Sequence, residues 1–249
     1  MAGHSKWKKI QRKKGAADAK RGKIFTQLIR EITICARKGG GDIDFNPALR
    51  AAVIAARQAN MPSDNIERAI KRGTGELEGV SFEQVSYEAY GPGGVAMIVD
   101  VITDNKNRIV SELRNCFTRY NGNLATTGSV AWMFTKKGII TVDKKDSTEE
   151  KLLELALNAG ADDMKDEGEY FEIQASFENF EGVRKAIEYS HVKISSADLS
   201  MAPQSTVHLH GKEAQQMINL VEALEAFDDV QKVHANFDID EQELEKLAS

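Results

Sequence analysis

The sequence predicts a multidomain protein of the α and α+β classes, in which an N-terminal three-helix domain precedes two ferredoxin-like α+β domains. Two observations favour this fold. The first 75 residues contain three apolar segments of helical period, separated by breaks rich in glycine and proline. From Val85 onward, short apolar strands alternate with amphipathic helices.

The distribution of charge divides the chain at about the same place. Residues 1–75 contain 17 Lys or Arg and 6 Asp or Glu, a net charge of +11. Residues 76–249 contain 16 Lys or Arg and 32 Asp or Glu, a net charge of −16. Such asymmetry between the halves of a chain indicates a polyanionic partner for the basic part.

Residues 1–17 are predicted to form an arm, because lysine dominates them and only Trp7 and Ile10 are apolar anchors. A helix is predicted over 18–38, where apolar residues recur from Ile24 at every fourth position. Beside this apolar stripe the helix carries a second, basic stripe of residues seven apart. The members of the basic stripe are Lys23, Arg30 and Arg37.

A second helix is predicted to begin at Pro47, with Asn46 as its N-cap. It presents Arg50 and Arg57 seven residues apart on one face. A short third helix follows and is expected to end at Gly73.

We expect the basic residues of this region to neutralise phosphates of a nucleic acid. The alternatives are that the charge is a solvated helical face, or that it docks on the protein's own acidic half. The predicted nucleic-acid-binding residues are Lys6, Lys8, Lys9, Arg12, Lys13, Lys14, Lys20, Arg21, Lys23, Arg30, Arg37, Arg50 and Arg57.

The remainder of the chain predicts two α+β domains. One comprises residues 80–135 together with 204–240, and the other, residues 136–203, is inserted into it; two consecutive domains without insertion are the alternative. Predicted strands cover 85–90, 95–103, 130–134, 138–143, 170–175, 192–195, 206–210 and 230–237. Predicted helices cover 105–120, 148–159, 180–189 and 212–226, and 241–249 is expected to be a polar terminal turn.

The start of the helix over 105–120 is a candidate secondary phosphate contact. Backbone N–H groups and the helix dipole favour an anion at such a terminus. The residues that would contact it are Asn105, Lys106, Asn107 and Arg108. Ordinary capping of this helix by Thr103 or Asp104 is the alternative.

The sequence predicts neither a catalytic site nor a bound cofactor or metal. His208 and His210 share one face of a strand, but no cysteine or carboxylate cluster accompanies them. The turn Gly91–Gly94 lacks the spacing of known phosphate-binding loops, and the acidic stretch 162–169 is expected to be a solvated loop. The absence of a long apolar run excludes a predicted membrane span, and the two cysteines indicate a reducing, cytoplasmic compartment.

Short motifs along the whole chain resemble those of the YebC family. Ile43 stands where that family usually has proline, and Ala89 where glycine is common. The motifs are MAGHSKW at 1–7, DAKRGKIFT at 18–26, LIREI at 28–32, ANMP at 59–62, DNIERAI at 64–70, YGPGG at 90–94, TDNKNR at 103–108, GSVAWMF at 128–134, DDVQ at 228–231 and NFDI at 236–239.

The resemblance implies a three-domain protein without known enzymatic activity. Members of the family are described as transcriptional regulators that bind DNA, and a mitochondrial relative is a translational activator for cytochrome c oxidase subunit I. The expected function is therefore that of a DNA-binding transcription regulator. A translation factor on RNA or the ribosome and a protein-interaction scaffold are the alternatives, and polymerase or ribosomal proteins are the expected further partners.

Overall fold

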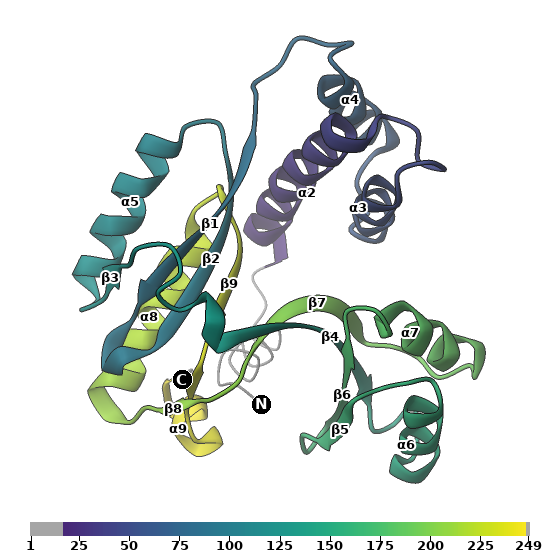
Figure 1. Ribbon diagram of the computed structural model, residues 1–249, viewed down its shortest axis with the longest axis vertical. Coiled ribbons are helices and arrows are strands. Elements are labelled where there is room, and N and C mark those ends of the chain that lie inside the picture. Colours follow the sequence, from purple (N-terminus) through teal and green to yellow (C-terminus); the bar gives the residue numbers. More distant parts are fainter. Residues whose placement is uncertain (1–16, 248–249) are drawn as a thin grey trace. The chain divides into compact units, whose positions relative to one another are not determined.

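The computed structural model describes residues 17–247, with side chains from residue 22 onward except at positions 241 and 245. The chain separates into two compact units (Figure 1). Of the described residues, Trp132–Thr206 form one unit, and residues 17–131 together with 207–247 form the other. We describe each unit by itself.

The unit that contains residues 17–131 and 207–247 includes the predicted helical region, which is confirmed. Its helices are α2 (Ala17–Gly39), α3 (Pro47–Gln58) and α4 (Ser63–Thr74). They share one apolar cluster, in which Ile32 and Leu49 are completely buried. Helix α2 packs against both shorter helices (Figure 1).

Asn46 fixes the start of α3, as predicted. Its Oδ1 accepts a hydrogen bond from the Leu49 backbone N–H at 3.1 Å. Its Nδ2 donates to the carbonyl oxygens of Cys35 and Gly40 at 2.9 and 2.8 Å. Asn46 therefore caps one helix and ties the intervening loop to the end of another.

Gly73 does not end α4, contrary to the prediction. The helix continues to Thr74, and Gly75 adopts the left-handed conformation just beyond it, with φ of 84°. Gly73 is buried where α4 meets α2, and a Cβ atom there would lie 2.5 Å from the Thr33 carbonyl oxygen. The glycine permits the close approach of two helices rather than a turn.

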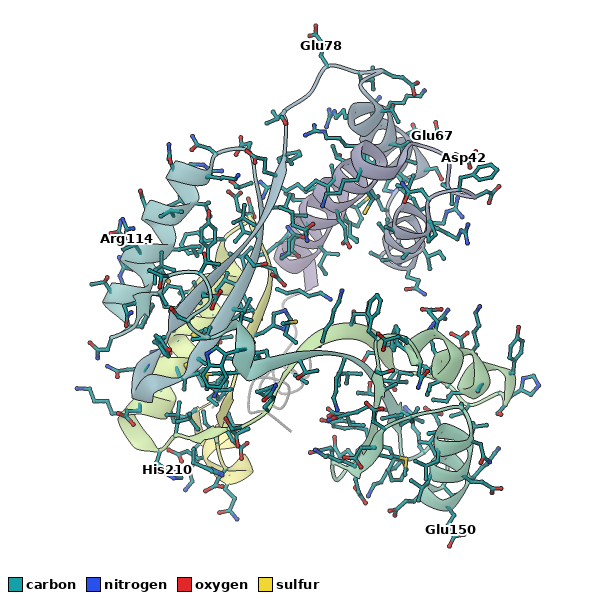
Figure 2. The ribbon with its side chains drawn as sticks, viewed as in Figure 1. Asp42, Glu67, Glu78, Arg114, Glu150 and His210 are labelled. Carbon is teal, nitrogen blue, oxygen red and sulfur yellow. The ribbon has the colours of Figure 1, made fainter. Side chains whose placement is uncertain are left out.

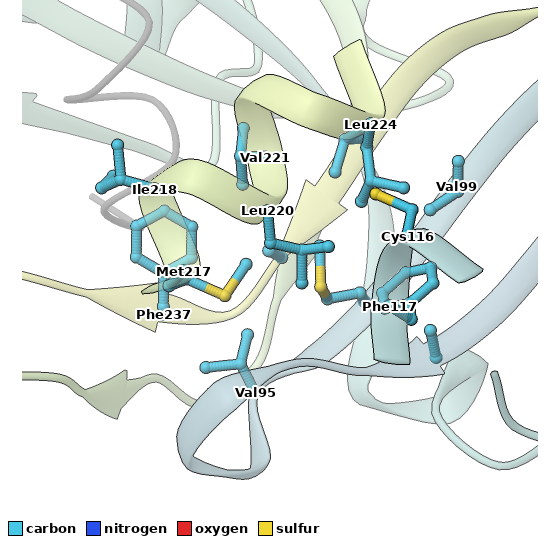
Figure 3. Close-up of a cluster of buried hydrophobic side chains, with 14 of the residues drawn as sticks. Val95, Val99, Cys116, Phe117, Met217, Ile218, Leu220, Val221, Leu224 and Phe237 are labelled. Atoms are coloured by element: carbon cyan, nitrogen blue, oxygen red, sulfur yellow. The ribbon is translucent and has the colours of Figure 1, made fainter. Parts of the chain in front are cut away.

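The same unit contains a four-stranded antiparallel sheet in the order β3-β1-β2-β9. Its strands are β1 (Glu83–Tyr90), β2 (Ala96–Thr103), β3 (Asn123–Leu124) and β9 (Val230–Ala235). Helices α5 (Lys106–Arg119) and α8 (Gly211–Ala226) supply the apolar residues that cover one face. Figure 3 shows this core, in which Phe117 of α5 and Leu220 of α8 are completely buried.

Two predictions in this part of the unit are wrong, one about a strand and one about a helix cap. Residues 130–134 do not form a strand: a 3₁₀ turn covers Ala131–Met133, and the next strand begins at Phe134. The Glu88 carboxylate accepts hydrogen bonds from the backbone N–H groups of Val130 and Ala131 at 2.6 and 2.9 Å. These N–H groups are therefore not available for pairing with a neighbouring strand. Asn105, rather than Thr103 or Asp104, is the N-cap of α5.

The C-terminal part of the unit contains more regular secondary structure than predicted. The strand expected over 230–237 divides at Asn236, whose Oδ1 accepts the Ala96 backbone N–H at 2.8 Å. Strands β8 (Val207–His208) and β10 (Phe237–Asp238) then pair in parallel. The expected polar turn is helix α9 (Glu241–Leu247), because Leu244 is completely buried in the core.

The unit Trp132–Thr206 has the βαββαβ order and the strand order β5-β6-β4-β7 of a ferredoxin-like domain. Its strands are β4 (Phe134–Asp143), β5 (Asp163–Asp166), β6 (Tyr170–Ser176) and β7 (Ser196–Pro203). Its helices are α6 (Glu149–Asn158) and α7 (Phe180–Tyr189).

Two predictions in this unit are wrong. The strand expected over 192–195 begins only at Ser196. The acidic stretch expected to be a loop includes β5, which pairs with β6. Charged residues are accommodated there because β5 is an edge strand with solvent on one side.

Candidate nucleic-acid interface

The N-terminal part of the predicted interface cannot be placed. Six of its residues lie outside the described part of the chain, and two lie on α2 at positions where only the backbone is described. The six are Lys6, Lys8, Lys9, Arg12, Lys13 and Lys14, and the two are Lys20 and Arg21.

The basic stripe of α2 faces the sheet of its own unit. The Lys23 ammonium donates to the Phe227 carbonyl oxygen at 2.9 Å. One turn later, Gln27 donates to the Val230 carbonyl oxygen at 2.6 Å. Burial lowers the pKa of Lys23, although the charges of Asp228 and Glu225 oppose this effect.

Arg30 makes the most contacts of the stripe. Its guanidinium donates to the carbonyl oxygens of Ile102 and Asp228 at 3.2 and 2.7 Å. It also pairs with the Asp229 carboxylate at 2.7 Å and lies 5.4 Å from the centre of the Phe82 ring. Phe82 precedes β1 and Ile102 lies in β2, whereas Asp228 and Asp229 directly precede β9. Arg30 therefore connects α2 to segments that are far apart in the sequence.

Asp229 is the hub of this contact, and its side chain is only 3% exposed. While one carboxylate oxygen pairs with Arg30, the other accepts from Arg108 at 2.7 Å and from the Thr103 hydroxyl at 2.8 Å. A buried carboxylate requires such partners, because its desolvation is costly. The Asp229 hub, by which we mean Asp229 with these three donors, therefore joins α2, β2 and α5.

Arg37 completes the stripe by donating to the Ser81 hydroxyl at 2.7 Å and the Phe82 carbonyl oxygen at 3.1 Å. Lys23, Arg30 and Arg37 thus have hydrogen-bond partners inside the molecule. This arrangement corresponds to the alternative in which basic residues dock on the protein's own acidic half. Nucleic-acid binding by these three side chains stays a prediction.

The outer faces of α3 and α4 carry further basic side chains, which are exposed. Arg50 donates to the carbonyl oxygens of Ile43 and Asp44, so it holds the loop before α3. Arg57 is exposed and makes no hydrogen bond or ion pair with the described residues.

Three further basic residues on α4 were not among the predicted site residues. Arg68, Lys71 and Arg72 are exposed, and their side chains likewise have no polar partner among the side chains and backbone that the structure describes. Their spacing of three and four residues places them on one face of the helix. That spacing was visible in the sequence, opposite the buried Ile66 and Ala69. We call Arg57, Arg68, Lys71 and Arg72 the α3–α4 basic surface.

Comparison with known proteins identifies the family of this chain. The TACO1/YebC protein N-terminal domain matches residues 5–76, and the TACO1/YebC second and third domain matches residues 82–237. The chain belongs to the TACO1/YebC family.

Relatives in the family are similar over their whole length. A "probable transcriptional regulatory protein" of Desulforapulum autotrophicum is 56% identical over 239 residues, covering 96% of this chain and 97% of the relative. One of the same description from Geobacter sulfurreducens is 57% identical and covers 99% and 100%. The crystal structure of a conserved hypothetical protein from Aquifex aeolicus matches with a TM-score of 0.81 and 48% identity, covering 90% of this chain and 92% of that one.

The secondary phosphate contact predicted for this TACO1/YebC member is occupied by the protein's own groups. Asn105 Oδ1 accepts the Arg108 N–H at 3.0 Å, which caps α5. Lys106 forms an ion pair with Glu83, and this contact raises the pKa of Lys106. Arg108 pairs with Asp104 at 2.8 Å and with the Asp229 hub. Capping, the alternative to anion binding, describes these contacts, although the cap is Asn105.

His208 and His210 lie with their rings stacked, 6.3 Å between centroids. His208 lies 3.6 Å from the Asp238 carboxylate, and His210 lies 3.6 Å from that of Glu243. No group of three or more His, Cys, Asp or Glu residues in the described chain is arranged to hold a metal ion. None of the described helices has the length and apolar character needed to cross a membrane.

Proposed function

We propose that this protein is a non-catalytic regulator of gene expression that binds nucleic acid, with duplex DNA as its target. The observation that carries the proposal is the α3–α4 basic surface. Its four charged side chains are exposed and lack polar partners among the described residues, in a region of net charge +11. The printed names of the relatives, probable transcriptional regulatory proteins, support a regulatory role.

In the proposed mechanism, lysines of the arm and the α3–α4 basic surface contact phosphates and release condensed counterions. Such contacts give affinity and orientation but little sequence information. The docked stripe of α2 acts as the support that holds α3 and α4 in place. The net charge of −16 on residues 76–249 repels the same polyanion and limits binding to the basic region.

The salt dependence of binding provides the test. We expect the variant R68A/K71A/R72A to bind duplex DNA more weakly than the wild type. Its slope of log affinity against log salt should be smaller by about 0.9 for each lost phosphate contact, or about 2.7 if all three contact phosphate. Fluorescence anisotropy of a labelled duplex, titrated at several salt concentrations, measures both quantities.

The matched control removes three exposed lysines from the unit Trp132–Thr206. The variant K151A/K185A/K193A changes the net charge by the same amount. Its slope should stay close to that of the wild type. Equal slopes for both triple variants would show that bulk charge, and not the α3–α4 basic surface, determines binding.

Phosphate contacts alone do not distinguish DNA from RNA, so the same surface also fits a translation factor. Crosslinking in cells, followed by sequencing of bound DNA and bound RNA, separates the two. Enrichment of promoter DNA is the expected result. Recovery of ribosomal RNA without promoter enrichment would replace transcription by translation as the regulated step.

A further inference from the structure

Phe45 is the most exposed large apolar side chain in the described chain, at 85% of its maximum accessibility. It lies in the loop that joins α2 to α3, near Asp42, which Figure 2 labels. An exposed aromatic ring in a mobile loop needs no explanation. The loop that carries Phe45, however, is held by several hydrogen bonds.

Residues on both sides of Phe45 are fixed. Asn46, which follows it, is 5% exposed and makes the three hydrogen bonds that tie it to α2 and α3. Asp44, which precedes it, donates its N–H to Asp42 Oδ1 at 2.8 Å. Arg50 donates to the carbonyl oxygens of Ile43 and Asp44. The loop therefore presents the ring to solvent in a preorganised way.

The exposed face of α3 continues from this loop. Arg50, Ile54 and Arg57 recur at i, i+4 and i+7, so they lie on one side of the helix. Ile54 is 47% exposed, and α3 contains no acidic residue. The result is a surface in which an aromatic ring and an aliphatic side chain are accompanied by positive charge.

We propose that Phe45 stacks on an unpaired base of a single-stranded nucleic acid whose phosphates lie along α3. This proposal rests on the nucleic-acid binding proposed above and goes beyond it, because it adds a single-stranded ligand to the duplex target. A bare aromatic ring offers its face to any base, and neighbouring arginine neutralises the adjoining phosphate. Repulsion from Asp42 and Asp44 directs the phosphates away from the loop and towards Arg57.

A protein partner fits this surface less well. A hydrophobic protein interface normally buries a contiguous apolar patch, whereas the side of α3 that carries the exposed Ile54 also carries Arg50 and Arg57. An exposed aromatic ring next to a cationic helix face is typical of proteins that bind single strands.

The test compares the full-length variants F45A and F45Y with the wild type. The probes are single-stranded DNA and RNA oligonucleotides that each carry one 2-aminopurine, together with the corresponding duplex. We expect F45A to weaken single-strand binding about fivefold or more, since one base stack is lost. F45Y, which keeps a ring, should bind like the wild type, and duplex binding should be unchanged in both variants.

The control is Y189A, which removes a side chain that is 81% exposed in the unit Trp132–Thr206. It should leave every affinity unchanged. Quenching of 2-aminopurine fluorescence on binding should occur with the wild type and F45Y and should be reduced with F45A.

Two results would overturn the proposal. If F45A binds single strands as tightly as the wild type, while the wild type still binds duplex DNA in a salt-dependent way, the stacking contact is wrong and the proposed function stands. If F45Y is as weak as F45A, the ring does not act by stacking. A wild-type protein that binds neither single strands nor duplex would instead refute the proposed function itself.

Discussion

Removing the Asp229 carboxylate should loosen α2 from the sheet. Asp229 accepts from Arg30, Arg108 and the Thr103 hydroxyl, and its side chain is almost fully buried. In D229A, Arg30 keeps two carbonyl partners but loses its counter-charge. The Thr103 hydroxyl, in a residue that is 1% exposed, loses its acceptor at 2.8 Å and keeps only the Asn105 carbonyl oxygen at 3.3 Å.

The two ion pairs of the hub differ in exposure, and this difference sets the expected magnitudes. The Arg30 side chain is 14% exposed, so its hydrogen bond to the carboxylate should contribute about 2–3 kcal/mol. The Arg108 side chain is 44% exposed, which leaves a contribution of about 0.2–1 kcal/mol after solvent screening. For D229A alone we expect a loss of about 3–5 kcal/mol, because a buried charge loses its partner.

A pair of double-mutant cycles isolates these contributions. One cycle combines R30A with D229A, and the other combines R108A with D229A. Hydrogen exchange of the α2 backbone amides, followed by mass spectrometry, reports the free energy of local opening in each variant. Urea unfolding followed by circular dichroism provides a second measurement of the same differences.

The coupling free energy between Arg30 and Asp229 should exceed that between Arg108 and Asp229. Equal couplings, or a larger one for Arg108, would contradict the assignment of Arg30 as the main anchor. If the effects of R30A and D229A on stability are additive, the ion pair between Arg30 and Asp229 contributes no net stability.

Two further predictions concern glycine packing and pH. The substitution G73A should destabilise the protein by about 1–3 kcal/mol through overpacking against α2, whereas G182A, which meets no atom within 4 Å, should stabilise α7 by about 0.5–1 kcal/mol; thermal unfolding measures both, and a shared sign would refute the packing argument. Burial raises the pKa of Glu88, but hydrogen bonds from backbone N–H groups including that of Gly128 outweigh it, so the pKa lies below its usual value. The stabilisation is therefore present above the unfolded pKa of about 4.3 and is lost as pH falls through the folded value; the difference in Tm between wild type and E88Q should shrink in acid, and a constant difference would contradict it.

Local signals predicted the helices well. The start of α3 at Pro47 follows from the cap at Asn46, and α7 has the predicted bounds, residues 180–189. Such boundaries depend on residues within one helical turn, so the sequence contains the information. The confirmed order of a helical region followed by two α+β sheets follows from the same periodicities.

Strand positions were less predictable, because pairing partners determine them. Strand β7 has a polar sequence and was expected four residues earlier. It lies at Ser196–Pro203 because its whole length pairs with Phe134–Thr141 of β4. The 3₁₀ turn at 131–133 likewise depends on Glu88, a residue more than 40 positions away.

The candidate interface shows the same limit. Periodicity correctly placed Lys23, Arg30 and Arg37 on one face of α2. It could not show what lies against that face, because the partners of Lys23 and Arg30 are separated from them by 72 to 204 residues. The exposed basic residues of α4 were visible as a pattern, but only the structure distinguishes them from residues with internal partners.

The anchoring of α2 has a consequence for the order in which the chain acquires its structure. Lys23 and Gln27 are bonded to carbonyl groups of Phe227 and Val230, which a ribosome synthesises more than 200 residues later. During synthesis, α2 can pack with α3 and α4 long before these partners exist. Helix α2 is therefore attached to the sheet only after most of the chain has been made, and until then Lys23 and Arg30 lack the partners that they have in the finished protein.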